Sequence, residues 1–317
     1  MIDFRYHLVS LVAVFLALAI GIVLGSGPLE EPIQGTLKSQ ADALKRDSDK
    51  LRAENAAQAR QLSAADKFTG EVMKAMVPNQ LAARTVVVVS LPGVGKSQVS
   101  SVTKVLGDAG ATVLGTVSLS DKYVDPKNSA ALEDLALRLV PPGVTFVDNA
   151  TPMDRVDTVL AAALVVDDAS RAGKVNTASA EVLAGLADFG ALSTSGDPTK
   201  RAELAVVLAP AAPKTQTVAT DAVTAALQPL PLRLDARARG VVLAGATGSD
   251  DKGGLIAVLR GAGNARKGLT TVDDIDTTGG LLAAVLALVE QTRQAFGDYG
   301  TGGNADAAIP DLSASTR

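Results

Sequence analysis

The residues whose types and spacing come closest to a known chemical motif are Gly95, Lys96 and Ser97, which follow an apolar run and open a segment of helical periodicity. A phosphate-binding loop has the pattern G-x-x-x-x-G-K-[ST], in which backbone N–H groups and the lysine hold the phosphates. Here Ser90 replaces the first glycine, although Asp167 follows another apolar run as a metal-binding carboxylate would. The alternative is an ordinary strand-to-helix turn with a solvated lysine. The missing glycine favours the turn.

A second candidate site is a cluster of acidic residues. Asp273, Asp274 and Asp276 precede Thr277, Thr278 and an apolar segment of helical periodicity. Three carboxylates can hold a hard cation, but Asp and Thr at this position are also common helix caps. The spacing is not that of a calcium-binding EF-hand loop. Helix capping is therefore the favoured interpretation.

Hydrolase and soft-metal chemistry have few residues to draw on. His7 is the only histidine and cysteine is absent, which excludes disulfides, thiolate sites and a Ser-His-Asp triad beyond the N-terminal segment. Copper(I) sites use Cys, Met or His. The methionines are Met1, Met73, Met76 and Met153, and the pair on one helix face is more typical of core filling. We therefore expect no catalytic residue, cofactor or metal ligand, and not an enzyme.

Composition points to the fold class. Of 317 residues, 47% are hydrophobic but only 3% are aromatic, so Ala, Val and Leu must build the core. Small side chains suit helices packed closely on a parallel sheet. The net charge of −4, without a basic stripe on the globular part, excludes nucleic-acid binding as the expected function.

The globular part alternates apolar runs with helical patterns. Residues 86–89, 206–208 and 241–243 are unbroken apolar runs, which indicate strands buried on both faces and hence a parallel sheet. Segments of helical period lie between them. The sequence thus predicts an open, mostly parallel α/β domain over residues 84–296, followed by a loose C-terminal tail over residues 297–317.

Near the N-terminus, residues 8–24 form an apolar run that as a helix would span about 26 Å, close to the hydrocarbon thickness of a bilayer. A cleaved signal peptide is the alternative, but no A-x-A site follows the run and Pro28 stands where a mature chain would begin. We therefore predict an uncleaved anchor within residues 1–28. Arg5 before the run, and Glu30 with Glu31 after it, predict a cytoplasmic N-terminus and an extracytoplasmic globular domain at the cell membrane.

Two patterns predict a parallel homodimer. Small residues recur at every fourth position of the apolar run, a spacing that lets two helices pack closely in lipid; they are Ala13, Ala17, Gly21 and Gly25. Residues 29–66 then carry a heptad repeat typical of a coiled-coil stalk, with Leu37, Leu44 and Leu51 at d and Ala41, Ser48, Asn55 and Leu62 at a. Asn55 in the seam favours two strands. The alternative is a single amphipathic helix lying along its own domain, and residues 67–83 are expected to form a separate linking helix.

The chain also resembles a known family in its terminal blocks. Residues 10–27, SLVAVFLALAIGIVLGSG, resemble the N-terminal signature of the actinobacterial copper transport protein B family, called MctB or SteB. Residues 271–280, 298–302 and 305–310 resemble that family's closing segments. At residues 296–298 the chain departs from a Gly-rich, His-containing run of the family, which removes a potential copper ligand.

The resemblance implies two functions. One is copper homeostasis or efflux in the envelope. The other is a role in cell separation, in which the protein pairs with a membrane partner, SteA, and controls wall hydrolysis. No metal-site residue carries over. With a single predicted span and few ligands, we expect a non-catalytic, membrane-anchored dimeric scaffold, with copper handling and a degenerate phosphate-loop nucleotide-binding protein as the alternatives.

Overall fold

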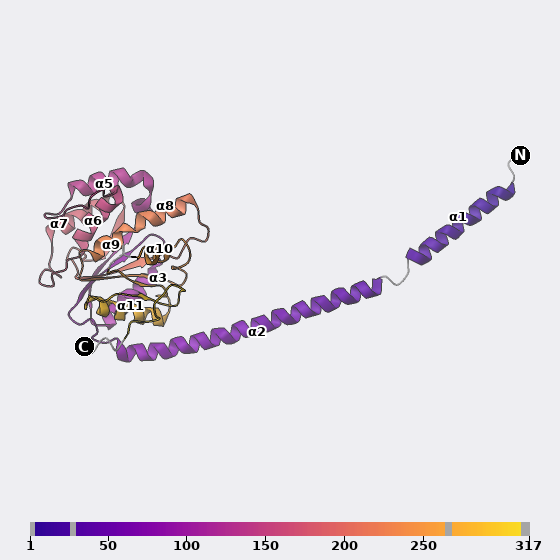
Figure 1. The fold of residues 1–317 in the computed structure, drawn as a ribbon, viewed down its shortest axis with the longest axis horizontal. Helices are drawn as coiled ribbons and strands as arrows, with labels where there is room; N and C mark the ends of the chain where they lie inside the picture. Colours follow the sequence, from indigo (N-terminus) through magenta and orange to yellow (C-terminus); the bar gives the residue numbers. More distant parts are fainter. Residues whose placement is uncertain (1–3, 26–29, 264–267, 312–317) are drawn as a thin grey trace. The chain divides into compact units, whose positions relative to one another are not determined.

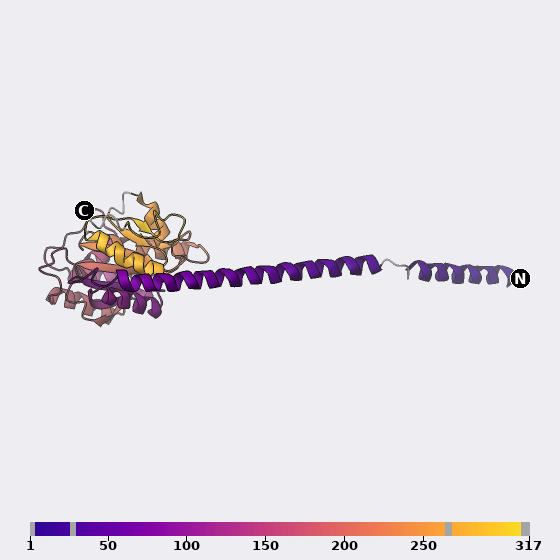
Figure 2. The ribbon, with the colours of Figure 1, turned by 90° about the horizontal axis from the view of Figure 1, so that it is seen from below.

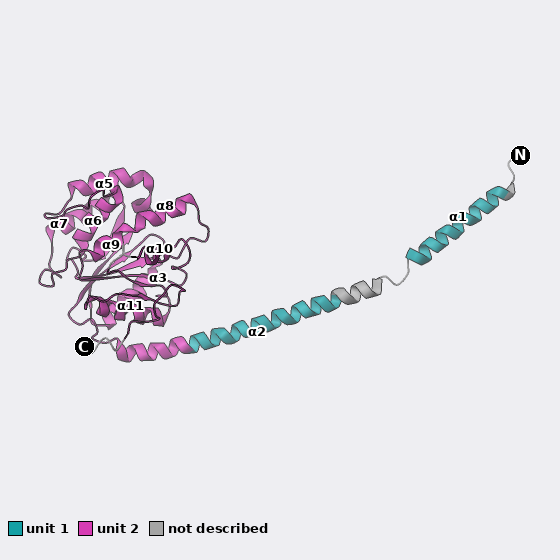
Figure 3. Cartoon of the chain, viewed as in Figure 1, with its two compact units in different colours: residues 1–64 teal, residues 65–317 magenta. Residues whose placement is uncertain are grey.

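The computed structural model describes residues 4–25, 30–263 and 268–311, with the side chains of residues 4, 5 and 30–37 left out. Its chain divides into two compact units, residues 1–64 and residues 65–317, coloured separately in Figure 3. The heptad leucine Leu37 therefore lies outside the described side chains.

The first unit is helical. Helix α1 (Phe4–Gly25) is apolar almost throughout, and α2 (Glu30–Met76) begins in this unit and ends in the second (Figure 1). Among the described residues, one helix, over Tyr6–Gly25, is long and apolar enough to cross a membrane, with a mean hydropathy of 2.9. At a rise of about 1.5 Å per residue, the 47 residues of α2 extend about 70 Å.

The second unit is an α/β fold, which confirms the predicted class. Its strands are β1 (Thr85–Ser90), β2 (Thr112–Leu119), β3 (Leu192–Gly196), β4 (Leu204–Ala209), β5 (Gly240–Gly245), β6 (Thr270–Val272) and β7 (Asp298–Tyr299). They form one sheet in the order β3-β2-β1-β4-β5-β6-β7. All neighbours are parallel except β2 and β3, so the sheet is mostly parallel with one antiparallel edge strand.

Helical segments alternate with these strands. They are α3 (Lys96–Asp108), α4 (Asp121–Val124), the 3-10 turn η1 (Pro126–Asn128), α5 (Ser129–Arg138), α6 (Pro152–Leu164), α7 (Thr177–Phe189), α8 (Val218–Leu227), α9 (Pro229–Asp235), α10 (Leu255–Gly261) and α11 (Thr278–Gln291). The longer predicted segments of helical period lie in α3, α5 and α11.

The unbroken apolar runs are explained by two cores, one on each face of the sheet. In β1, Val87 and Val89 pack with α5, α6, α7 and α9, whereas Val86 and Val88 pack with α3 and α11. Successive side chains of a strand point to opposite faces, so a strand with no polar position must be covered on both sides. Figure 2 shows α11 in yellow beside the last turns of α2.

Two details differ from the expected organisation. The segment expected as a separate linking helix is the end of α2, because the single Gly70 does not break the helix and Pro78 follows its last turn. Residues after Gly297 do not form only a loose tail. Asp298 and Tyr299 pair with β6 as strand β7, and Tyr299 bridges to Ala307.

Candidate functional site

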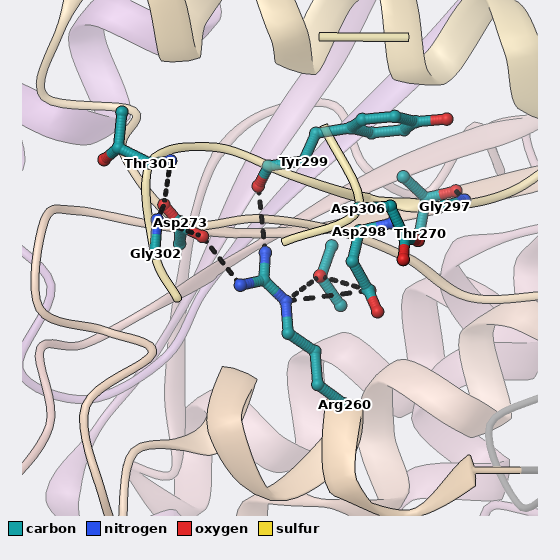
Figure 4. Close-up of polar contacts among 10 residues, drawn as sticks. Arg260, Thr270, Asp273, Gly297, Asp298, Tyr299, Thr301, Gly302 and Asp306 are labelled. Atoms are coloured by element: carbon teal, nitrogen blue, oxygen red, sulfur yellow. Dashed lines mark hydrogen bonds and ion pairs between the residues drawn. The ribbon is translucent and has the colours of Figure 1, made fainter. Parts of the chain in front are cut away.

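The two C-terminal blocks that resemble the copper transport family come together in space. The first block supplies the end of β6 and the loop before α11, and the second supplies β7 and the turn after it. Between them lies Arg260, at the end of α10, with 3% of its side chain exposed. Figure 4 shows its guanidinium group directed between the two blocks.

Each guanidinium nitrogen of Arg260 has a partner. Nη1 donates to Asp273 Oδ2 at 2.7 Å, Nη2 to the carbonyl of Tyr299 at 2.9 Å, and Nε to Thr271 Oγ1 at 2.8 Å. Nε is also 3.6 Å from Asp298 Oδ1. A charge removed from water is tolerated only when it is paired and hydrogen-bonded in this way.

Asp273 extends the contact to the C-terminal turn. The N–H groups of Thr301 and Gly302 donate to its Oδ1 at 2.9 and 3.1 Å. A Cβ at residue 302 would lie 1.7 Å from Asp250 Oδ2, so a larger residue there would have to displace that side chain. The carboxylate of Asp273 thereby links β6, α10 and the turn after β7.

The neighbouring acids have other roles. Asp276 Oδ1 accepts the N–H and hydroxyl of Thr247 at 2.8 and 3.0 Å. Asp274 is 5% exposed, and its Oδ1 has no hydrogen-bond partner among the described residues. Burial, with the nearby charges of Asp273 and Asp276, raises the pKa of Asp274 to about 6. This carboxyl therefore changes charge close to neutral pH.

The expected helix cap is confirmed at Thr277. Its Oγ1 accepts the N–H of Gly280 at 3.0 Å and so begins α11. The next N–H, of Thr278, donates to Asp66 Oδ1 at 2.9 Å, which fastens the last part of α2 to the start of α11. Across the described ranges, no group of three or more His, Cys, Asp or Glu side chains is arranged to hold a metal ion.

The cluster around Arg260 stabilises the fold rather than forming an open binding site. The Arg260 nitrogens and the Asp273 oxygens are occupied by protein partners, so neither offers a free group to a substrate. The sequence does not indicate a special role for Arg260, because an arginine near the end of a helix usually lies in solvent. Asp273 and Asp298, its acidic partners, become neighbours only through the pairing of β6 with β7.

The phosphate-loop candidate is a strand-to-helix turn. β1 ends at Ser90 and α3 begins at Lys96, whose side chain is exposed. The N–H of Gly95 donates to Gln98 Oε1 at 3.0 Å, and that of Val94 to a carbonyl of the same turn at 3.3 Å. Both backbone donors are thus used inside the turn, unlike those of a loop that binds phosphate. Asp167 lies apart, at the exposed end of the segment after α6.

The three methionines of the α/β unit lie at two separate places in its core. Met73 and Met153 are half-buried and pack against opposite cores, as expected of gap-filling side chains. Met76 is also half-buried, at the end of α2. His7 is in α1, in the other unit.

The predicted dimer residues whose side chains are described lie on exposed surfaces of the helical unit. Leu44 is 71% exposed and Leu51 58%, and Asn55 and Ala17 are exposed as well. A Cβ added at Gly21 or Gly25 would meet nothing within 4 Å. Their pairing with a second chain stays a prediction.

Comparison with known proteins gives the family. The profile of a family described as "Copper transport outer membrane protein, MctB" matches residues 1–310. The chain belongs to the MctB family. It is 32% identical over 314 residues to "Copper transporter MctB" of Mycobacterium tuberculosis, a match that covers 95% of this chain and 97% of the relative. It is 30% identical, with the same coverage, to the protein of that name from Mycobacterium leprae.

Family membership confirms the resemblance read from the terminal blocks. Together with the apolar helix α1, the family's description indicates association with a membrane. That description names the outer membrane, whereas the charges flanking α1 predicted a span of the cell membrane.

Proposed function

We propose that this MctB family member is a non-catalytic, membrane-anchored scaffold of the cell envelope that works as a parallel homodimer. The observation that carries the proposal is the row of exposed leucines on α2. Leu44, Leu51 and Leu62 are 71%, 58% and 71% exposed, and no described residue of the helical unit covers them. Their heptad positions place them on one side of the helix, where a second α2 would bury them.

Helix α1 supports the same arrangement. Small side chains at Ala17, Gly21 and Gly25 form one stripe, and nothing in the described chain occupies the space beside the two glycines. In lipid, such a stripe lets two helix backbones approach closely. Anchor and stalk would then pair in the same parallel orientation.

The remaining parts of the proposal come from sequence and family. The charges flanking the anchor support a cytoplasmic N-terminus and an extracytoplasmic α/β unit. The resemblance supports a SteA-like membrane partner and a role in cell separation through wall hydrolysis.

The parallel dimer can be tested with one engineered thiol, because the chain has no cysteine. Leu44→Cys places a thiol at a d position, where two parallel chains bring identical residues together. We expect the full chain to form a covalent dimer under mild oxidation. Asp49→Cys, at an outward b position, is the matched control and should crosslink poorly. Equal crosslinking of both variants, or light scattering that gives a monomer at high micromolar concentration, contradicts the dimer.

The scaffold role is tested by changing the phase of the seam. Deleting residues 45–51 removes one heptad and preserves the repeat, whereas deleting residues 45–48 shifts the following apolar positions off the seam. Each variant is expressed at equal level in a strain that lacks its own copy, and cell separation is scored by microscopy. The four-residue deletion should impair separation more than the longer one. The reverse order, or full function from both, contradicts a paired stalk.

Copper handling is the second candidate, and the family description and the names of the relatives favour it. Copper would be cargo, and the described chain offers thioethers rather than thiolates. Loss of the gene should then lower copper tolerance, and Met73→Leu with Met76→Leu should fail to restore it. Full restoration by this double variant, together with no Cu(I) binding by calorimetry, argues that any copper phenotype is indirect.

A further inference from the structure

The α/β unit has a cavity of about 370 Å³ at the edge of the sheet where the parallel strands begin. The segment before β4, the turn before α7 and the segment between α9 and β5 each contribute one arginine to its wall. These are Arg201, Arg171 and Arg237. Asp167 is the one acidic residue among those that line the cavity.

The backbone holds the three arginines in place. The carbonyl of Arg201 accepts the N–H of Gly173 at 3.0 Å, next to the bridge of Ala202 with Val165. The N–H of Arg171 donates to the carbonyl of Asp168 at 3.0 Å, in a tight turn. The N–H of Arg237 donates to the carbonyl of Leu234 at 3.0 Å, at the end of α9. Each of the three segments that carry the cationic wall is thus held by a backbone hydrogen bond at its arginine.

Asp167 in the lining and Asp168 beside Arg171 offset only part of the positive charge of this wall. No hydrogen bond or salt bridge of the three guanidinium groups is found there, and the buried Nε of Arg201 has no partner. Burial, and then the charge of Arg171, lowers the pKa of Arg201; burial also lowers the pKa of Arg237. Glu203 near the cavity is paired with Arg84 at 3.0 Å. These guanidinium groups differ in this respect from that of Arg260, whose nitrogens all have partners.

We propose that this cavity, lined by Arg171, Arg201 and Arg237, binds the phosphate group of a small organic phosphate monoester. Three arginines against one aspartate leave a charge of +2 on the wall, which matches a phosphate monoester of about −2 near neutral pH. Planar guanidinium groups bind phosphate oxygens through paired N–H donors. The cavity is larger than a phosphate needs and falls among small-molecule sites of about 300 to 1,000 Å³. Val144 and Val166 give it an apolar part for the organic group.

Calorimetry on the full chain in an uncharged detergent, at constant ionic strength and pH 7.5, tests the site with phenyl phosphate as the probe. We expect saturable binding of one phenyl phosphate per chain, and weaker binding of inorganic phosphate, which cannot use the apolar wall. Arg201→Gln and Arg171→Gln should each weaken binding at least tenfold. Arg171 is exposed, so its variant tests the site even if the Arg201 variant does not fold.

Arg239→Gln is the matched control, because Arg239 is an exposed arginine close in sequence but outside the cavity lining. It should bind phenyl phosphate as the unaltered chain does. An equal loss in this control would show non-specific charge attraction and overturn the proposal, as would the absence of saturable binding. A separate arm offers phosphatidic acid in mixed micelles. Binding of the lipid without binding of phenyl phosphate would overturn a small-molecule site in favour of a lipid headgroup.

Discussion

The two units place leucine side chains in opposite environments. Leu106 in α3 is fully buried between the helix and the sheet, whereas Leu51 in α2 is 58% exposed at a seam position. The α/β unit covers its apolar side chains with its own helices on both faces of the sheet. The helical unit leaves its apolar residues open to whatever surrounds the chain, lipid along α1 and, as we propose, a second chain along α2. Stability in one unit should thus depend on the chain alone, and in the other on its surroundings.

The largest expected effect on the α/β unit comes from its buried charge. Arg260→Ala leaves Asp273 and Asp298 buried without their cation, which should lower the free energy of unfolding by about 3 to 5 kcal/mol. Pulse proteolysis of the full chain in a urea series measures this change. The exposed Arg239→Ala should shift stability by less than about 0.5 kcal/mol. Similar effects of the two changes would mean that the Arg260 cluster does not stabilise the fold.

A matched pair of leucine truncations tests the contrast between the units. Leu106→Ala opens a cavity in a closed core and should cost the α/β unit about 2 to 5 kcal/mol. Leu51→Ala should leave that unit within about 0.5 kcal/mol of the original, because the leucine contributes nothing to its core. The same urea series serves both variants. A large loss of α/β stability from Leu51→Ala would show that the two units do not unfold independently.

A smaller effect should follow pH through Asp274. Its pKa is raised from 3.8 to about 6, so the folded chain binds this proton more tightly than the unfolded chain. The stability associated with the protonated form is complete below about pH 4 and is lost as pH rises through 6. Asp274→Asn should therefore stabilise the α/β unit by about 1 to 3 kcal/mol at pH 7.5 and have little effect at pH 3.5. A gain of equal size at both values would exclude titration of Asp274 as its cause.

The strands that could be predicted from the sequence are those with a clear hydrophobic pattern of their own. β1, β4 and β5 are unbroken apolar runs, so their burial on both faces was visible in the sequence. β3 reads LSTSG and β7 has two residues, and neither carries a periodicity. Such edge strands are specified by their neighbours in the sheet rather than by their own side chains.

The candidate sites also differ in how far the sequence could predict them. Thr277 was recognisable as a cap because a cap and its helix are adjacent in sequence. Arg260 needs partners from two other elements, and the three arginines of the cavity come from three separate segments. Contacts of this kind are set by strand order, which no local spacing reveals.

The position of β7 in chain order has a consequence for synthesis. The ribosome delivers β1 first and β7 last, yet Arg260, which is made before β7, depends on Asp298 and on the carbonyl of Tyr299. Until those residues emerge, the nascent chain holds a cation with half of its partners and a sheet that ends at β6. A product that stops before residue 298 would leave Arg260 with half of its partners and should be less stable than the full chain. The hydrogen bonding of Arg260 is therefore completed only by residues that are made after it.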